Sequence, residues 1–115
     1  MSADHGLDDH DLTDEDRKLV VLARGALARA GVGQGAAVRD GDGRTYAGAP
    51  VAARTLQLTA LQVAVATALS SGASAFEAAV LVGGDADDPG VATLHEYGQA
   101  AVIVTDLSGT PIGEK

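Results

Sequence analysis

The stretch from Thr55 to Phe76 places the strongest constraint on how this chain can fold, because it contains no charged residue. A helix over this stretch would be apolar around its whole circumference, and such helices are either buried on every side or span a membrane. Several polar residues and a Ser-Ser-Gly end interrupt the apolar character that a bilayer requires. We therefore expect a central helix over 55–71 that is buried in a protein core.

The segments before this helix predict another helix and a hairpin. Apolar residues at helical spacing over 14–30 predict the first helix, with Thr13 as its N-cap. Asp-Gly pairs at 40–43 lie between two short segments, 36–39 and 45–48, and supply the positive φ angles that tight turns need. These two segments are predicted to be paired β-strands.

The segments after it predict a strand, a short helix and a second strand. The continuous apolar runs at 78–82 and 100–105 are typical of strands covered on both faces. Residues 91–98 between them are expected to form the short helix. The resulting order, α-β-β-α-β-(α)-β, predicts an α/β fold with a mixed β-sheet sandwiched by helices.

Charge divides the chain into an acidic leader and a nearly neutral body. Seven of its 16 acidic residues lie in residues 1–16, which contain no Lys or Arg. We expect 1–11 to be a disordered acidic tail and 12–115 to form a single domain. Because no basic stripe balances the acidity, nucleic acid and membrane surfaces are not expected partners. With no secretory signal and no cysteine in the sequence, the expected location is cytoplasmic.

Three stretches of the sequence carry motifs of a known kind. The first is Leu22-Ala23-Arg24 in the first helix, and the second is Gly35-Ala36-Ala37-Val38 followed by Asp42-Gly43-Arg44-Thr45-Tyr46-Ala47-Gly48. The third runs from Thr59-Ala60-Leu61-Gln62 to Ser70-Ser71-Gly72. Together they resemble the cytidine deaminase family, in whose active members the helix similar to this third stretch begins Cys-Ala-Glu. The resemblance implies the deaminase fold, a zinc-bound water that attacks the substrate and a glutamate that shuttles protons.

The sequence departs from the family at each of these functional positions. Thr59 stands at the position of the first zinc ligand, and Leu61 at that of the glutamate. Matching Pro89 to the family proline puts Gly90 and Thr93 at the two cysteine positions; matching 94–98 to the end of the family helix instead deletes part of that turn. Neither alignment supplies a thiolate. We therefore expect no catalytic residue, no metal and no cofactor.

The substrate contacts that the resemblance implies have changed as well. Pro50 and Ala52 align with the asparagine and glutamate that grip the ribose, and neither side chain can hydrogen-bond a sugar hydroxyl. Tyr46, Thr59 and Gln62 are the remaining polar or stacking groups of a candidate pocket. For Thr59 and Gln62 the alternative is a hydroxyl and an amide whose hydrogen bonds are satisfied inside the core.

His95 and the acidic residues of 85–88 are a candidate metal site by residue type only. Their spacing does not match a calcium loop, and an exposed histidine beside a solvated loop explains the same residues.

These observations leave three functional hypotheses. The first is a catalytically inactive cytidine deaminase-like protein that acts as a homotetrameric or homodimeric assembly or regulatory subunit, with an unknown protein partner. A core of small residues, with 3% aromatics, and the uncharged helix indicate such association. The second is a binding module for a nucleoside or other small molecule in a modified pocket. The third, which has the least support, is an active hydrolase of the same class.

Overall fold

The computed structural model describes residues 12–31 and 33–114. The predicted tail, residues 1–11, lies outside this range. A five-stranded mixed sheet in the order β2-β1-β5-β6-β7 forms the middle layer of the fold. Its strands are β1 (Gly35–Asp40), β2 (Thr45–Gly48), β5 (Phe76–Val82), β6 (Ala101–Thr105) and β7 (Pro111–Glu114).

Strand directions follow from the connections between them. The β1–β2 turn joins an antiparallel pair with Val38 opposite Tyr46, and β1 is also antiparallel to β5. Strands β5 and β6 are parallel, with Val80 opposite Ile103, because a helix connects them. Strand β7 returns antiparallel to β6 and forms one edge.

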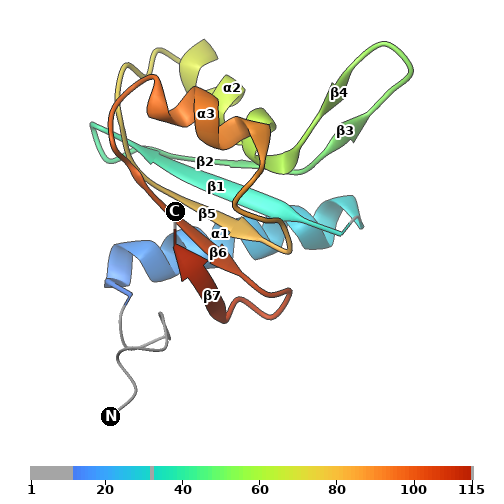
Figure 1. Ribbon diagram of the computed structural model, residues 1–115, viewed down its shortest axis with the longest axis horizontal. Coiled ribbons are helices and arrows are strands. Elements are labelled where there is room, and N and C mark those ends of the chain that lie inside the picture. The colour runs from blue at the N-terminus through green and yellow to red at the C-terminus, as the bar shows by residue number, and fades with distance from the viewer. Residues whose placement is uncertain (1–11, 32, 115) are drawn as a thin grey trace.

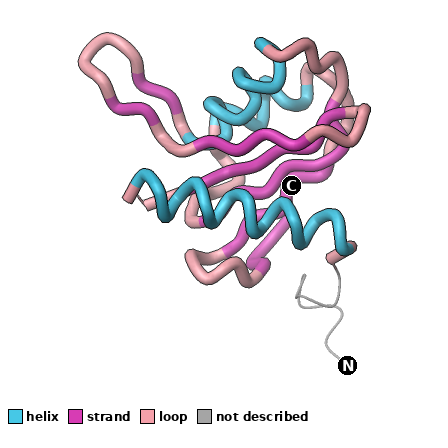
Figure 2. The backbone as a smooth tube through the Cα atoms, turned by 180° about the vertical axis from the view of Figure 1, so that it is seen from behind, coloured by secondary structure: helices cyan, strands magenta, loops and turns pink. Residues whose placement is uncertain are grey.

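Helices cover both faces of this sheet (Figures 1 and 2). Helix α1 (Asp14–Ala30) lies along one face, where its buried residues meet Ala37, Val80 and Ile103. Helices α2 (Ala60–Ser70) and α3 (Pro89–His95) share the other face. The predicted α/β sandwich with a mixed sheet is confirmed. No helix in the described part of the chain is long and apolar enough to cross a membrane.

The predicted helix over 55–71 is shorter than expected. Thr59 adopts an extended conformation, and its side chain accepts the hydrogen bond from the Gln62 backbone N–H, so the helix begins at Ala60. The residues before it form β4 (Gln57–Leu58), which pairs with β3 (Val51–Ala52) in a small hairpin. In Figure 1 this hairpin projects away from the sheet.

The prediction that this helix is buried on every side is also wrong. Ala66, Thr67 and Ser70 are exposed, whereas Val65 on the opposite face is 1% exposed. The helix is uncharged because its inner face packs on the sheet and its outer face carries small neutral residues.

Two further elements differ from the sequence prediction. The short helix begins at Pro89, because Asp88 caps its start, and it ends at His95. Strand β7, which follows the turn at Ser108-Gly109, was not predicted, since Pro111 and Gly113 weaken its strand signal.

A buried carboxylate organises the β1–β2 turn. Asp40 is 1% exposed, and its Oδ1 accepts hydrogen bonds from the backbone N–H groups of Asp42 and Arg44, both at 2.9 Å. Burial alone would raise the pKa of Asp40, but these bonds and one from the Tyr46 hydroxyl outweigh it and lower the pKa. The charged carboxylate therefore stabilises the fold above its unfolded-state pKa, and this contribution is lost as the pH falls through the lower folded-state value.

We predict that Asp40→Asn reduces the loss of stability between about pH 5 and pH 2, because the amide oxygen can still accept in the turn but cannot be protonated there. Urea unfolding across this range checks it. Asp42→Asn, which removes an exposed carboxylate from the same turn, is the control and should leave the profile unchanged. An Asp40→Asn profile with the slope of the unmodified protein would contradict the account.

Candidate functional site

The beginning of α2 is fixed by a reciprocal pair of hydrogen bonds. The Thr59 hydroxyl oxygen accepts from the Gln62 backbone N–H at 3.1 Å, and Gln62 Oε1 accepts from the Thr59 backbone N–H at 2.9 Å. This capping box satisfies N–H groups that the helix itself leaves without partners. Both side chains are thus engaged in capping the start of the helix.

Thr59 also joins α2 to α3. Its hydroxyl donates to Asp88 Oδ1 at 2.8 Å, and the same oxygen accepts from the backbone N–H of Gly90 at 2.7 Å. Asp88 is 8% exposed, so both bonds lie in a nearly dry environment where they are worth more than at the surface. One carboxylate oxygen therefore connects the first turns of the two helices.

Directly beneath this bond the two helices are in contact. Leu61 is fully buried, and a Cβ atom built on Gly90 would lie 2.8 Å from Leu61 Cγ and 3.0 Å from the Gln62 backbone nitrogen. Real Cβ contacts are not that short, so only glycine fits at position 90 at this helix separation. The space between the helix starts is filled by the leucine side chain.

Gln34 contributes to the same region from a distant part of the sequence. It precedes β1, and its Oε1 accepts from the backbone N–H of Ala60 at 2.9 Å. A side chain from the connector between α1 and β1 thus caps the first residue of α2.

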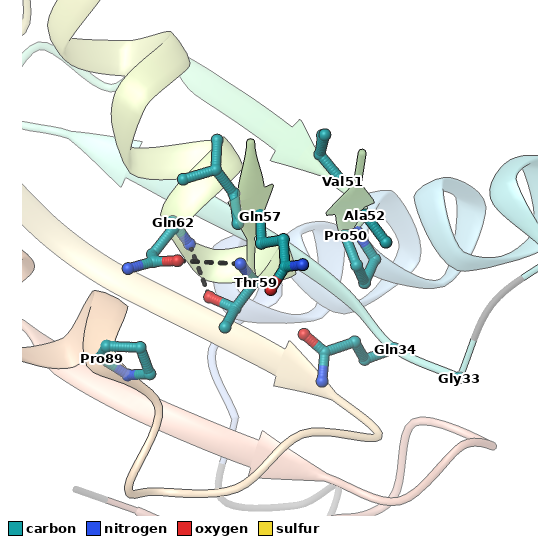
Figure 3. A pocket seen from close by; sticks show the side chains of 10 residues that line it. Gly33, Gln34, Pro50, Val51, Ala52, Gln57, Thr59, Gln62 and Pro89 are labelled. Atoms are coloured by element: carbon teal, nitrogen blue, oxygen red, sulfur yellow. Dashed lines mark hydrogen bonds between the residues drawn. The ribbon is translucent and has the colours of Figure 1, made fainter. Parts of the chain in front are cut away.

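A cleft of about 720 Å³ opens over these helix starts (Figure 3). Its wall is formed by the β3–β4 hairpin, the connector after α1, and the beginnings of α2 and α3. The lining residues are Gly33, Gln34, Pro50, Val51, Ala52, Gln57, Leu58, Thr59, Gln62 and Pro89. None of them is charged.

The structure brings most of the predicted pocket residues together. Pro50, Ala52, Thr59 and Gln62 line the cleft. Tyr46 does not; its hydroxyl donates to Asp40 Oδ2 at 3.3 Å in the β1–β2 turn.

The predicted degenerate positions divide between the interior and a second groove. Leu61 and Gly90 are buried beneath the cleft. Thr93 lines a smaller groove of about 200 Å³ between α2 and α3, together with Val65 and Ala66.

Sequence reasoning missed the capping roles of Asp88 and Gln34. An Asp-Pro pair before a short helix is a recognised N-cap followed by proline at the first helical position, so Asp88 had a usable signal. Gln34 had none, because its partner Ala60 lies 26 residues later in the chain.

His95 is partly buried, and its hydrogen bond is to Ala100 and not to the acidic loop at 85–88. Its Nε2 lies 3.1 Å from the carbonyl oxygen of Ala100, and since a carbonyl can only accept, the ring donates from that nitrogen. Across residues 12–31 and 33–114, no three His, Cys, Asp or Glu side chains are grouped as metal ligands.

A family model described as cytidine deaminase-like matches residues 12–109. The chain belongs to the cytidine deaminase-like family. Among solved structures, cytidine deaminase from Burkholderia pseudomallei is 22% identical, with a TM-score of 0.68 over 90% of this chain and 91% of the other. Cytidine deaminase from Mycobacterium leprae is 19% identical, with a TM-score of 0.70 over 90% and 93%. These likenesses show the shared fold. No curated protein matches the sequence.

The residues at this cytidine deaminase-like site do not fit the zinc ion that the family resemblance implies. Catalytic zinc needs three protein ligands drawn from Cys, His and carboxylates. Here the hydroxyl of Thr59 is neutral and already donates a hydrogen bond, Gly90 has no side chain, and Asp88 Oδ1 already accepts two hydrogen bonds. Of these three positions, only Asp88 offers a possible zinc ligand, and its carboxylate already takes part in hydrogen bonds.

We predict that Gly90→Ala destabilises the fold by about 1–3 kcal/mol, because the added methyl group overlaps Leu61. Leu61→Ala alone should cost about 2–5 kcal/mol by leaving a cavity. The double variant should cost less than the sum of the two, since the new methyl group fills that space.

Urea unfolding of the four proteins measures this coupling. Gly33→Ala is the matched control, because a Cβ atom there would contact nothing within 4 Å. Additive free energies for the pair at 61 and 90 would show that the two residues are not in contact.

Proposed function

We propose that this chain is a non-catalytic cytidine deaminase-like protein that serves as a homo-oligomeric assembly or regulatory subunit. The observation that carries the proposal is the packing of Leu61 against Gly90 beneath the Thr59–Asp88 hydrogen bond. Protein atoms fill the space between the helix starts, where the family resemblance places the metal and the proton shuttle.

Deamination by this family's chemistry requires an activated water and a group that can accept and return a proton. A leucine cannot transfer a proton, and the donor set around Thr59 is not one that holds zinc. Asp88 is the remaining carboxylate, and it is engaged in capping α3 and in the bond from Thr59. The site therefore lacks the means to generate or direct a nucleophilic water.

We predict no deamination of cytidine or deoxycytidine above background, and no stoichiometric zinc in the purified protein. Ultraviolet absorbance at high protein concentration and elemental analysis of the same sample check the two parts. Cytidine deaminase from Burkholderia pseudomallei, assayed in parallel, is the positive control. Turnover that follows this protein through purification, with about one zinc per chain, would overturn the non-catalytic assignment.

Association is supported by the outer surface of α2. The exposed residues Ala66, Thr67 and Ser70 present no charge, and the apolar groove formed by Leu58, Val65 and Leu69 runs beside them. An uncharged strip of this kind on a helix is suited to a two-fold contact with a second copy. Val65 itself is 1% exposed, so a charge there would disrupt the subunit's own core instead of testing the interface.

We predict that the unmodified chain is an oligomer and that Ala66→Glu dissociates it. An unpaired charge buried in an interface costs about 3 kcal/mol or more, which weakens association at least about a hundredfold. Light scattering after size exclusion measures the mass. Ala28→Glu, at an exposed position on α1, is the matched control and should leave the assembly intact. A monomeric unmodified chain at micromolar concentration would remove the assembly role.

The cleft favours a second candidate, a small-molecule binding module. At about 720 Å³ it falls within the range of about 300–1,000 Å³ that is usual for ligand pockets, and it combines aliphatic walls with a few polar groups. This function is compatible with loss of catalysis, since it requires no metal and no proton transfer.

A further inference from the structure

A groove of about 210 Å³ lies between α1 and the turn that joins β6 to β7. The turn packs directly on the helix, since a Cβ atom built on Gly109 would lie 2.9 Å from Val20 Cγ1 and 3.0 Å from Arg24 Cδ. Val21 also lines the groove and is 69% exposed. The groove therefore combines an apolar side chain that is open to solvent with an arginine whose aliphatic stem rests against the turn.

The charge of this groove is positive. Arg17 and Arg24 line it, and among the described residues no acidic side chain does so. Arg17 donates to Asp14 Oδ1 at 3.0 Å, whereas Arg24 is exposed and makes no hydrogen bond or ion pair within residues 12–31 and 33–114. Asp106, the acid of the neighbouring turn, uses its Oδ1 to accept hydrogen bonds inside that turn. The charge of Arg24 is thus available to a carboxylate from elsewhere.

The acidic tail, residues 1–11, has the complementary chemistry. It contains no Lys or Arg, and its acids are Asp4, Asp8, Asp9 and Asp11. Leu7 stands directly before Asp8 in the sequence. The tail therefore places an apolar side chain beside negative charge, as the groove places Val21 beside positive charge.

The tail is also long enough to reach the groove of its own chain. It joins the described chain at Leu12, which itself lines the groove. When extended, residues 7–11 span about 17 Å, at about 3.4 Å per residue. Arg24 lies about 15 Å along α1 from Asp14, at about 1.5 Å per residue. A tail that turns back at Leu12 therefore brings Asp8 alongside Arg24.

The covalent connection makes a weak contact effective. An exposed ion pair contributes little by itself and is screened by salt. A short linker, however, supplies an effective concentration of about millimolar, and it needs no partner from solution. We therefore expect docking that is reversible and that weakens as the ionic strength rises.

We propose that the acidic tail docks in the groove between α1 and the β6–β7 turn of its own chain. Asp8 and Asp9 pair with Arg24, and Leu7 packs on Val21. The docked tail occupies a site that an acidic segment of another protein would otherwise bind. This groove shares no residue with the cleft or with the outer face of α2, so the proposal is independent of the function proposed above.

A spin label on the tail tests the proposal. The chain has no cysteine, so a nitroxide attached to Ala3→Cys marks the tail at a single position. Broadening of the backbone amide signals of the full-length, ¹⁵N-labelled protein, relative to the reduced label, reports where the tail lies. We expect broadening at Val21, Arg24 and Gly109 at low ionic strength. Sodium chloride at about 0.5 M should remove most of it by screening the ion pair.

Charge variants show whether Arg24 holds the tail. Arg24→Gln should lower the broadening at Gly109 at least about twofold, because it removes the pairing charge. Arg29→Gln removes the same charge from an exposed position on the same helix outside the groove, and it should change nothing. Arg24→Glu should abolish the broadening, and adding Asp8→Lys and Asp9→Lys to it should restore at least part.

Equal broadening in the Arg24→Gln and Arg29→Gln proteins, no restoration by the charge swap, or no broadening at Gly109 in the unmodified groove would overturn the proposal. A mixture of spin-labelled ¹⁴N chains with unlabelled ¹⁵N chains identifies the source of the tail. We expect no broadening at Gly109 in this mixture. Broadening there would assign the docked tail to a second copy and would overturn docking on its own chain.

Discussion

The hydrogen bond from the Thr59 hydroxyl to Asp88 Oδ1 is the interaction on which the rest of the site depends. It connects two N-caps, so the starts of α2 and α3 are held by one carboxylate oxygen that also accepts from Gly90 N–H. The helices can approach this closely because position 90 lacks a side chain. Leu61 then fills the interior between them, and the cleft is left above it.

Hydrogen bonds hold the starts of α2 and α3 together here, and a bound metal ion is another way to hold two helix ends together. A metal ion tethers helix ends through coordinate bonds and leaves a polar, reactive centre. A capped pair of helices tied by hydrogen bonds instead leaves a centre whose charged group, the Asp88 carboxylate, is engaged by hydrogen bonds. The oxygen atoms of Thr59, Gln62 and Asp88 accept from backbone N–H groups at the two helix starts, and the Gln34 oxygen does so for Ala60. The Thr59 hydroxyl proton is taken up by Asp88.

Much of the fold could be predicted from the sequence because its signals are local. The Thr13 cap, the Asp-Gly turn after β1 and the apolar runs of β5 and β6 each depend on neighbouring residues. The start of α2 could not be placed from composition, since the uncharged run continues through β4 and only the cap at Thr59 separates strand from helix. Absence of charge indicates burial or a neutral surface, and it does not define an element's ends.

The site was less predictable, because its contacts join distant segments. The resemblance identified Thr59, Leu61 and Gly90 as altered positions, but the bond to Asp88 joins residues 29 apart in the chain. Tyr46 was expected at a pocket by residue type, whereas its hydroxyl is used in the turn at Asp40. Residue type shows what a side chain can do, and only the packing shows which partner occupies it.

The most direct test of this account is a high-resolution crystal structure of the full chain grown with zinc, with data collected at the zinc absorption edge. The account predicts a direct Thr59 Oγ1–Asp88 Oδ1 hydrogen bond near 2.8 Å, Leu61 against Gly90, and no anomalous peak between the starts of α2 and α3. An anomalous peak between the helix starts, with Leu61 turned away from Gly90 and Asp88 bound to the metal, would contradict it.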